Sequence, residues 1–171
     1  MASDSKGTLM NAAEQRPTQQ QLQGLIRVWQ GEHEELIQKI RQTTLWLGEL
    51  ARQAEPRFGE LGEHLTRFRQ SMLDHFHRES ALTDTLFQTY GCVETDSNRR
   101  RAADDHVHLS RRIDDLLGRL RDDGAGFASL QDAIQQVGIF VDAVEQHEEE
   151  EAEGLQWLGS PCAEPRPAAE F

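Results

Sequence analysis

Apolar residues recur along much of this chain at alternating steps of four and three, the spacing of one face of an α-helix. Four such runs follow one another, separated by short stretches that contain proline, glycine or several polar residues. They are Leu22–Leu50, Leu61–Leu86, Ala102–Leu120 and Leu130–Leu158. Because short turns between helices imply antiparallel neighbours, the pattern predicts an all-α, up-down-up-down antiparallel four-helix bundle over residues 17–159.

The boundaries of these helices are marked by residues with known positional preferences. Thr18 is suited to cap the first helix, and Pro56 is suited to the first turn of the second. We predict a loop at Cys92–Ser97, with its last two residues as caps for the third helix, and a turn at Asp122–Gly126 before the fourth.

Both ends of the chain have a different composition. Residues 1–16 are polar without a sustained period, and residues 160–171 are rich in proline and alanine. We expect a flexible N-terminal arm and a flexible C-terminal tail on either side of the bundle.

The overall composition restricts the function further. A net charge of −12 among 171 residues argues against a nucleic-acid partner, because phosphate contacts need a basic face. No apolar stretch approaches the ~20 residues of a membrane span, and nothing resembles a signal peptide. Cys92 and Cys162 do not form a disulfide framework. We therefore expect a cytoplasmic protein without a membrane partner.

Polar residues interrupt the apolar face of each predicted helix near its middle. They are His33, His75, Glu79, His106, His147 and Glu151. Each is in phase with the apolar run of its own helix and is expected to point toward the bundle axis. Burying such groups is costly unless something satisfies them, and imidazole with carboxylate is the ligand mixture of a transition metal.

Counting residues from the turns places these side chains at similar heights. His33 and His75 differ by only about 3 Å and His106 and His147 by roughly 7 Å, at about 1.5 Å per residue. Glu79 and Glu151 each follow a histidine by four residues, so each pair shares one helix face. Two such pairs supply carboxylates that could bridge two metal ions, which favours iron or manganese.

The segments GEHEELIQKI, HFHRESAL, DDHVHLSRRI and VEQHEEEEAEGL resemble the four ligand-bearing helices of the hemerythrin-like, cation-binding domain family. The resemblance covers about residues 18–158. It implies a non-heme centre of two iron ions, with bridging carboxylates and an open position for dioxygen or a related small oxidant. The ligands it implies are the six residues above.

The chain also departs from the oxygen-carrier pattern of that family. Where true hemerythrins have a second histidine on the third helix, this chain has Ser110. The difference disfavours simple reversible oxygen carriage and favours sensing, redox, or oxidase- or peroxidase-like chemistry. On the fourth helix, the heptad phase selects Glu151 as the carboxylate, and we interpret residues 148–150 as a solvated acidic face.

Two other functions are compatible with the same residues. One is an iron-sensing or iron-handling protein whose fold depends on metal occupancy. The other is a structural bundle without metal. The remaining histidines, His64, His77 and His108, lie off the apolar faces and are interpreted as surface residues. Phe76 and Trp29 are expected in the core or in the wall of the site.

Overall fold

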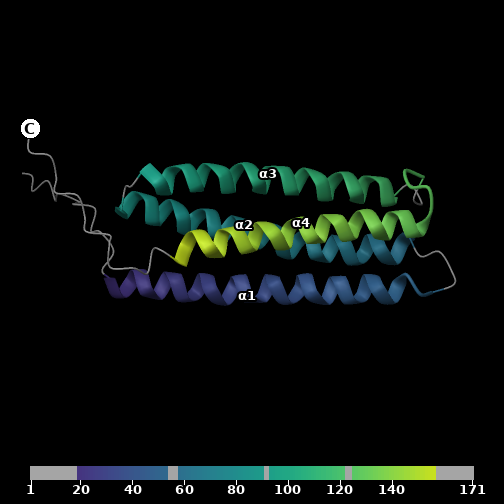
Figure 1. The fold of residues 1–171 in the computed structure, drawn as a ribbon, viewed down its shortest axis with the longest axis horizontal. Helices are drawn as coiled ribbons and strands as arrows, with labels where there is room; N and C mark the ends of the chain where they lie inside the picture. Colours follow the sequence, from purple (N-terminus) through teal and green to yellow (C-terminus); the bar gives the residue numbers. More distant parts are fainter. Residues whose placement is uncertain (1–18, 54–57, 91–92, 122–124, 157–171) are drawn as a thin grey trace, which may run out of the picture.

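The computed structural model describes residues 19–53, 58–90, 93–121 and 125–156, which form four α-helices and no strand. The helices are α1 (Gln19–Leu50), α2 (Phe58–Tyr90), α3 (Val93–Arg121) and α4 (Leu130–Gln156). They lie side by side as one bundle (Figure 1). The predicted all-α bundle is therefore confirmed. The predicted arm and tail lie outside the described residues.

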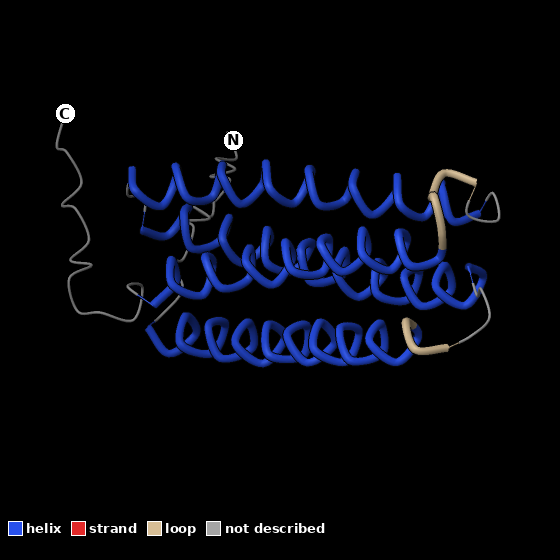
Figure 2. Tube along the Cα trace, turned by 45° about the vertical axis from the view of Figure 1, so that its right-hand side comes forward, coloured by secondary structure: helices blue, strands red, loops and turns tan. Residues whose placement is uncertain are grey.

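Each helix packs against two others. α1 contacts α2 and α4, and α3 contacts the same two helices from the opposite side. Figure 1 shows that consecutive helices run in opposite directions and that α1 and α3 lie on opposite sides of the bundle, with α2 and α4 between them. Figure 2 shows the same bundle turned by 45°. This arrangement is the up-down-up-down order that the short turns predicted. No helix among the described residues is long and apolar enough to cross a membrane.

The start of α3 differs from the prediction. The helix begins at Val93, so the stretch that we expected to be a loop up to Ser97 belongs to its first turns. Acidic and small polar residues are accommodated at a helix N-terminus, where they complement the helix dipole. The proposed caps Thr18 and Pro56 lie outside the described residues.

The start of α4 is fixed by a reciprocal cap. The backbone N–H of Asp132 donates to the Ser129 hydroxyl at 3.1 Å, and the backbone N–H of Ala128 donates to the Asp132 carboxylate at 2.9 Å. These bonds satisfy N–H groups that have no partner within the helix. The turn that was predicted to end at Gly126 therefore extends to Ser129.

Arg119 ties this turn to the end of α3. Its guanidinium donates to the Gly126 carbonyl at 2.6 Å and to the Gln136 side chain at 2.8 Å. A Cβ at Gly126 would lie 2.9 Å from Arg119 Nε, so a side chain there would push the arginine away. These contacts therefore fix the position of α4 along the bundle axis relative to α3.

Among the side chains that the structure describes, most of the buried apolar ones lie on one side of the predicted histidines. Large buried side chains follow His33 on α1 and His106 on α3, and they precede His75 on α2 and His147 on α4. Because neighbouring helices are antiparallel, these are the same half of the bundle, the half that contains the α1–α2 and α3–α4 turns. Its most buried members include Ile40, Leu50, Leu61, Leu65, Met72, Ile113, Val137 and Phe140.

Candidate metal centre

The four histidines on the apolar faces lie at nearly the same height in the bundle. His33 precedes the last residue of α1 by 17 residues, and His75 follows the first residue of α2 by 17. His106 precedes the end of α3 by 15 residues, and His147 follows the start of α4 by 17. At about 1.5 Å per residue, the largest difference is about 3 Å. The four helices therefore bring these imidazoles into one layer.

Seven side chains meet in this layer as two groups. Glu79, His106, His147 and Glu151 form the four-residue cluster, and His33, His75 and Glu148 form the three-residue cluster. Within each cluster, one nitrogen or oxygen atom from every side chain lies within 4.8 Å of the others. All six residues predicted from the sequence belong to one cluster or the other, and Glu148 is an addition.

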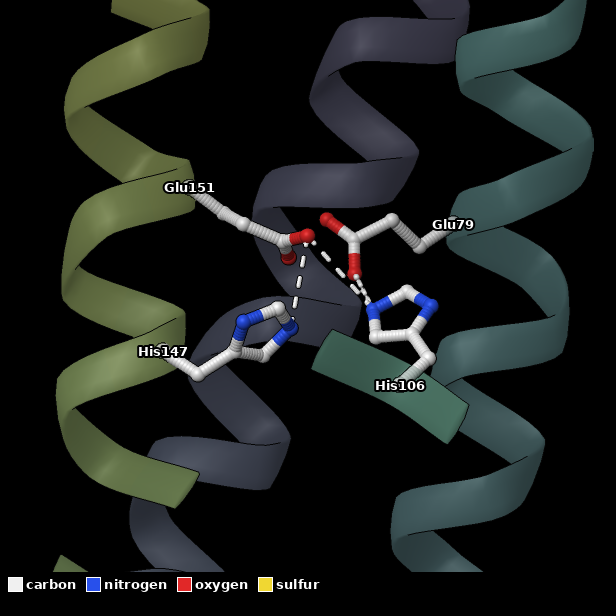
Figure 3. A group of neighbouring side chains, drawn as sticks. All are labelled: Glu79, His106, His147 and Glu151. Atoms are coloured by element: carbon white, nitrogen blue, oxygen red, sulfur yellow. Dashed lines mark ion pairs between the residues drawn. The ribbon is translucent and has the colours of Figure 1, made fainter. Parts of the chain in front are cut away.

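Figure 3 shows the four-residue cluster, in which side chains from α2, α3 and α4 point toward a common centre. Nε2 of His106 lies 3.5 Å from Oε1 of Glu151, and Nε2 of His147 lies 3.3 Å from the same oxygen. The imidazole rings of His106 and His147 are nearly perpendicular, with centroids 4.9 Å apart. The arrangement leaves two imidazole nitrogens and two carboxylates facing one point.

The three-residue cluster is built around Glu148. Its Oε2 lies 2.8 Å from Nδ1 of His33 and 3.1 Å from Nε2 of His75. Glu148 is completely buried, and His75 is only 2% exposed. Two imidazoles and one carboxylate thus converge next to the first cluster.

Glu79 connects the two clusters. Its Oε2 lies 3.6 Å from Nε2 of His75 and 3.5 Å from Nε2 of His106. Its other oxygen, Oε1, accepts a hydrogen bond of 2.8 Å from the buried indole N–H of Trp29. The indole therefore holds the carboxylate with one oxygen between histidines of the two clusters, which is the position of a bridging ligand.

These close approaches do not satisfy the groups involved. Each of the seven side chains has at least one buried nitrogen or oxygen atom without a hydrogen-bond partner. Native proteins rarely leave so many buried polar atoms unsatisfied, because each costs about 1–3 kcal/mol. Within each cluster the side chains offer ligand atoms that lie within 4.8 Å of one another, and a cation there would satisfy them together.

The two carboxylates of the four-residue cluster have pKa values displaced in opposite directions. Burial, a hydrogen bond with Glu79 and the neighbouring charges of Glu79 and Glu148 raise the pKa of Glu151 to about 11. Burial also acts to raise the pKa of Glu79, but contacts with His106 and Glu151 outweigh it and lower that pKa to about 2. Without a metal, Glu151 therefore keeps a proton at neutral pH beside an ionised Glu79.

We predict a distinctive pH dependence for the metal-free protein. Because the pKa of Glu151 rises from 4.5 to about 11 on folding, the folded state binds more protons than the unfolded state in that interval. The free energy of unfolding should then fall as pH increases above about 4.5, by up to about 1.4 kcal/mol per pH unit. Urea unfolding at pH 5.5, 6.5 and 7.5 would measure this slope.

The variant E151Q has no proton to lose at this position, so its stability should depend less on pH than that of the wild type. E149Q, at an exposed neighbouring position, should keep the wild-type slope. Parallel curves for the wild type and E151Q would contradict the assignment of the retained proton to Glu151.

Aromatic side chains cover the clusters. The ring of Phe76 stacks on His106 with centroids 4.0 Å apart and meets His147 edge-on at 5.5 Å. Trp29 stacks on His33 with centroids 4.9 Å apart. Both aromatic residues are buried, as the sequence predicted for the core or the wall of the site. They limit the access of water to the ligand atoms.

The interpretation of Glu148 as part of a solvated acidic face is wrong. Glu149 and Glu150 are exposed, but Glu148 points into the bundle. The sequence contained a signal for this, because the apolar residues Ile134 and Val141 precede Glu148 by 14 and 7 residues and so share its heptad position. Both are buried in the structure. The inward face of α4 is thus wider than a strict coiled-coil seam and includes a third heptad position.

The remaining histidines lie outside the two clusters. His77 and His108 are exposed, as predicted. His64 is half-buried instead of exposed: its ring stacks on Trp46 with centroids 4.0 Å apart, and its Nε2 lies 3.1 Å from the Thr43 hydroxyl. It precedes His75 by 11 residues on the same helix, or about 16 Å. It therefore packs among the apolar residues on the side of the α1–α2 turn, away from the two clusters.

A comparison with known proteins found no family model, curated protein or solved structure that matches this chain.

Proposed function

We propose that this chain is a non-heme di-iron protein that binds or reacts with dioxygen or a related small oxidant. The observation that carries the proposal is the convergence of seven unsatisfied ligand side chains from four helices, with one oxygen of Glu79 between the two clusters. A buried metal-free network of this kind would be strongly destabilising.

The donor set favours iron over other metals. Four imidazoles and three carboxylates are too rich in nitrogen for magnesium or calcium and contain no thiolate, which copper(I) and structural zinc sites often use. A carboxylate shared between two ions is typical of paired iron or manganese. The resemblance of the four ligand-bearing segments to hemerythrin-like domains supports iron.

The two clusters suggest how the ligands would be divided between the two metal ions. His33, His75 and Glu148 would hold one ion, and His106, His147 and Glu151 would hold the other, with Glu79 between them. Two iron ions held in this way would bind a small oxidant or transfer electrons to it. Glu151 would give up its proton as the second ion binds, and Trp29 would keep Glu79 oriented.

Binding is limited to small molecules by the packing around the site. Phe76 and Trp29 lie against the imidazoles, and the side chains of His75 and Glu148 have almost no exposed surface. A dry site strengthens the electrostatic interactions of its carboxylates and excludes bulky reactants. These properties suit dioxygen or a comparably small oxidant, and the cytoplasmic location expected from the sequence stays a prediction.

Iron loading under anaerobic conditions tests this proposal. The purified protein should bind about two irons per chain and gain a charge-transfer absorption that changes reversibly with air and dithionite. The measurements are metal quantitation and an optical spectrum before and after exposure to air. A colourless protein that binds no iron would contradict the proposal.

A further inference from the structure

A shallow surface cavity of about 350 Å³, wide open to solvent, lies between α2 and α3, and its lining includes His106, one of the proposed metal ligands. His106 and Phe76 line its inner part, and Ser80, Ser110, Arg111 and Asp114 are among its other lining residues. The cavity has room for several water molecules or for one small solute.

His106 presents its second ring nitrogen on the side away from the cluster. In Figure 3 its Nε2 faces Glu79 and Glu151, and Nδ1 points away from the other three side chains. No hydrogen bond or ion pair joins Nδ1 to another residue in the described part of the chain. For His147, by contrast, the outer nitrogen has the carboxylate of Asp105 at 3.9 Å.

A metal ion on Nε2 would fix the proton of His106 on Nδ1. That N–H then becomes an obligatory donor, and metal-bound histidines almost always give this proton to a carboxylate, a carbonyl or a water. Since no described protein group accepts it and His106 lines the cavity, the acceptor must come from the solution.

Two further donors line the same cavity. Arg111 is exposed and forms no ion pair with another described residue, and the Ser80 hydroxyl forms no hydrogen bond with one. The Ser110 hydroxyl is already committed, because it donates to the His106 carbonyl at 2.7 Å. The Ser110 hydroxyl is therefore not counted among the donors of the cavity.

The negative charge beside the cavity is compensated. Asp114 is paired with Arg69, with 2.6 Å between its Oδ1 and the arginine Nε. The guanidinium of Arg111 is therefore the uncompensated charge of the cavity, on a chain whose overall charge is −12. Guanidinium groups match the paired oxygens of carboxylates and tetrahedral oxyanions.

We propose that this cavity binds a small oxyanion, which accepts hydrogen bonds from His106 Nδ1, Arg111 and Ser80 and is thereby coupled to the metal on the other side of the His106 ring. The inference rests on the proposed function only in that a metal ion binds His106. An anion in this position would increase the electron donation of the imidazole to the metal. Metal and anion should therefore bind cooperatively, each raising the affinity of the other by the same factor.

Isothermal titration of sulfate into the zinc-loaded and the metal-free protein tests this inference. Sulfate should bind the zinc-loaded wild type at least about tenfold more tightly than R111Q, and zinc should increase the sulfate affinity of the wild type by about fivefold or more. R112Q is the matched control, because Arg112 is exposed on the same helix but lies over the ring of Phe140, outside this cavity. Acetate in a parallel titration shows whether the site prefers planar carboxylates.

Equal sulfate affinities for the wild type and R111Q would overturn the inference, and so would a sulfate affinity that zinc does not change. Zinc content should be the same in the wild type, R111Q and R112Q, so that a loss of sulfate binding is not a loss of metal. Because zinc is redox-inactive, a failure of the iron-loaded protein to react with oxidants would contradict the proposed function and leave this result unaffected. A protein that binds neither zinc nor iron would contradict both.

Discussion

Replacing Glu148 with glutamine is expected to remove one of the two proposed metal ions. Glu148 is the only carboxylate in the three-residue cluster, and its oxygen lies within 3.1 Å of nitrogens of both His33 and His75. Glutamine has a similar shape but no negative charge, so the affinity for one cation should fall at least about 100-fold. Metal quantitation after dialysis should then find about one iron per chain in place of about two.

The neighbouring residue provides the control for this experiment. Glu149 is exposed and belongs to neither cluster, so E149Q removes the same charge from the chain without changing a ligand. E149Q should bind as much iron as the wild type. Equal iron contents for E148Q and E149Q would show that Glu148 is not a ligand.

The double substitution H75L/E79M is expected to abolish paired metal binding and to stabilise the metal-free fold. It removes one ligand from the three-residue cluster and the carboxylate that connects the clusters. Both side chains are only 2% exposed, so apolar replacements of similar volume should increase the free energy of unfolding of the metal-free protein by about 1–4 kcal/mol. Chemical denaturation without metal measures this change.

Metal dependence separates this result from a purely structural effect. Iron at 1,000 times its dissociation constant should stabilise the wild type by about 4 kcal/mol and the double variant hardly at all. H77L/A81M, which places the same residue types at exposed positions of α2 with the same spacing, should keep the response of the wild type. If the wild type gains no stability from iron, the metal-free structural bundle becomes the better description of the chain.

The sequence was sufficient to predict the helices and six members of the two clusters, because both follow from a single periodicity. Polar residues in phase with a heptad run must face the interior of a bundle, whatever its loops do. Glu148 was missed for a physical reason: the first and fourth positions of the heptad define only the centre of the buried face. In the assembled bundle α4 packs against both α1 and α3, and this wider contact buries the next position as well.

The height of His106 relative to His147 along the bundle axis also could not be predicted from the apolar periodicity. Counting residues from the predicted turns gave a height difference of roughly 7 Å between these two histidines. The Ser129–Asp132 cap delays the start of α4 to Leu130, and Arg119 holds the turn in place, so the residual difference is about 3 Å. Hydrogen bonds of this kind depend on the three-dimensional path of the turn, which the apolar pattern does not describe.

The concentration of described apolar side chains in one half of the bundle bears on how the proposed metal ions would enter the site. The leucine-rich half lies toward the α1–α2 and α3–α4 turns and contains most of the buried apolar side chains that the structure describes, so it should hold the four helices together before any ion binds. The opposite end could then open locally and admit the ions one at a time. In zinc fingers the metal creates the fold, whereas here the apolar half should keep the bundle assembled while the proposed metal site is still empty.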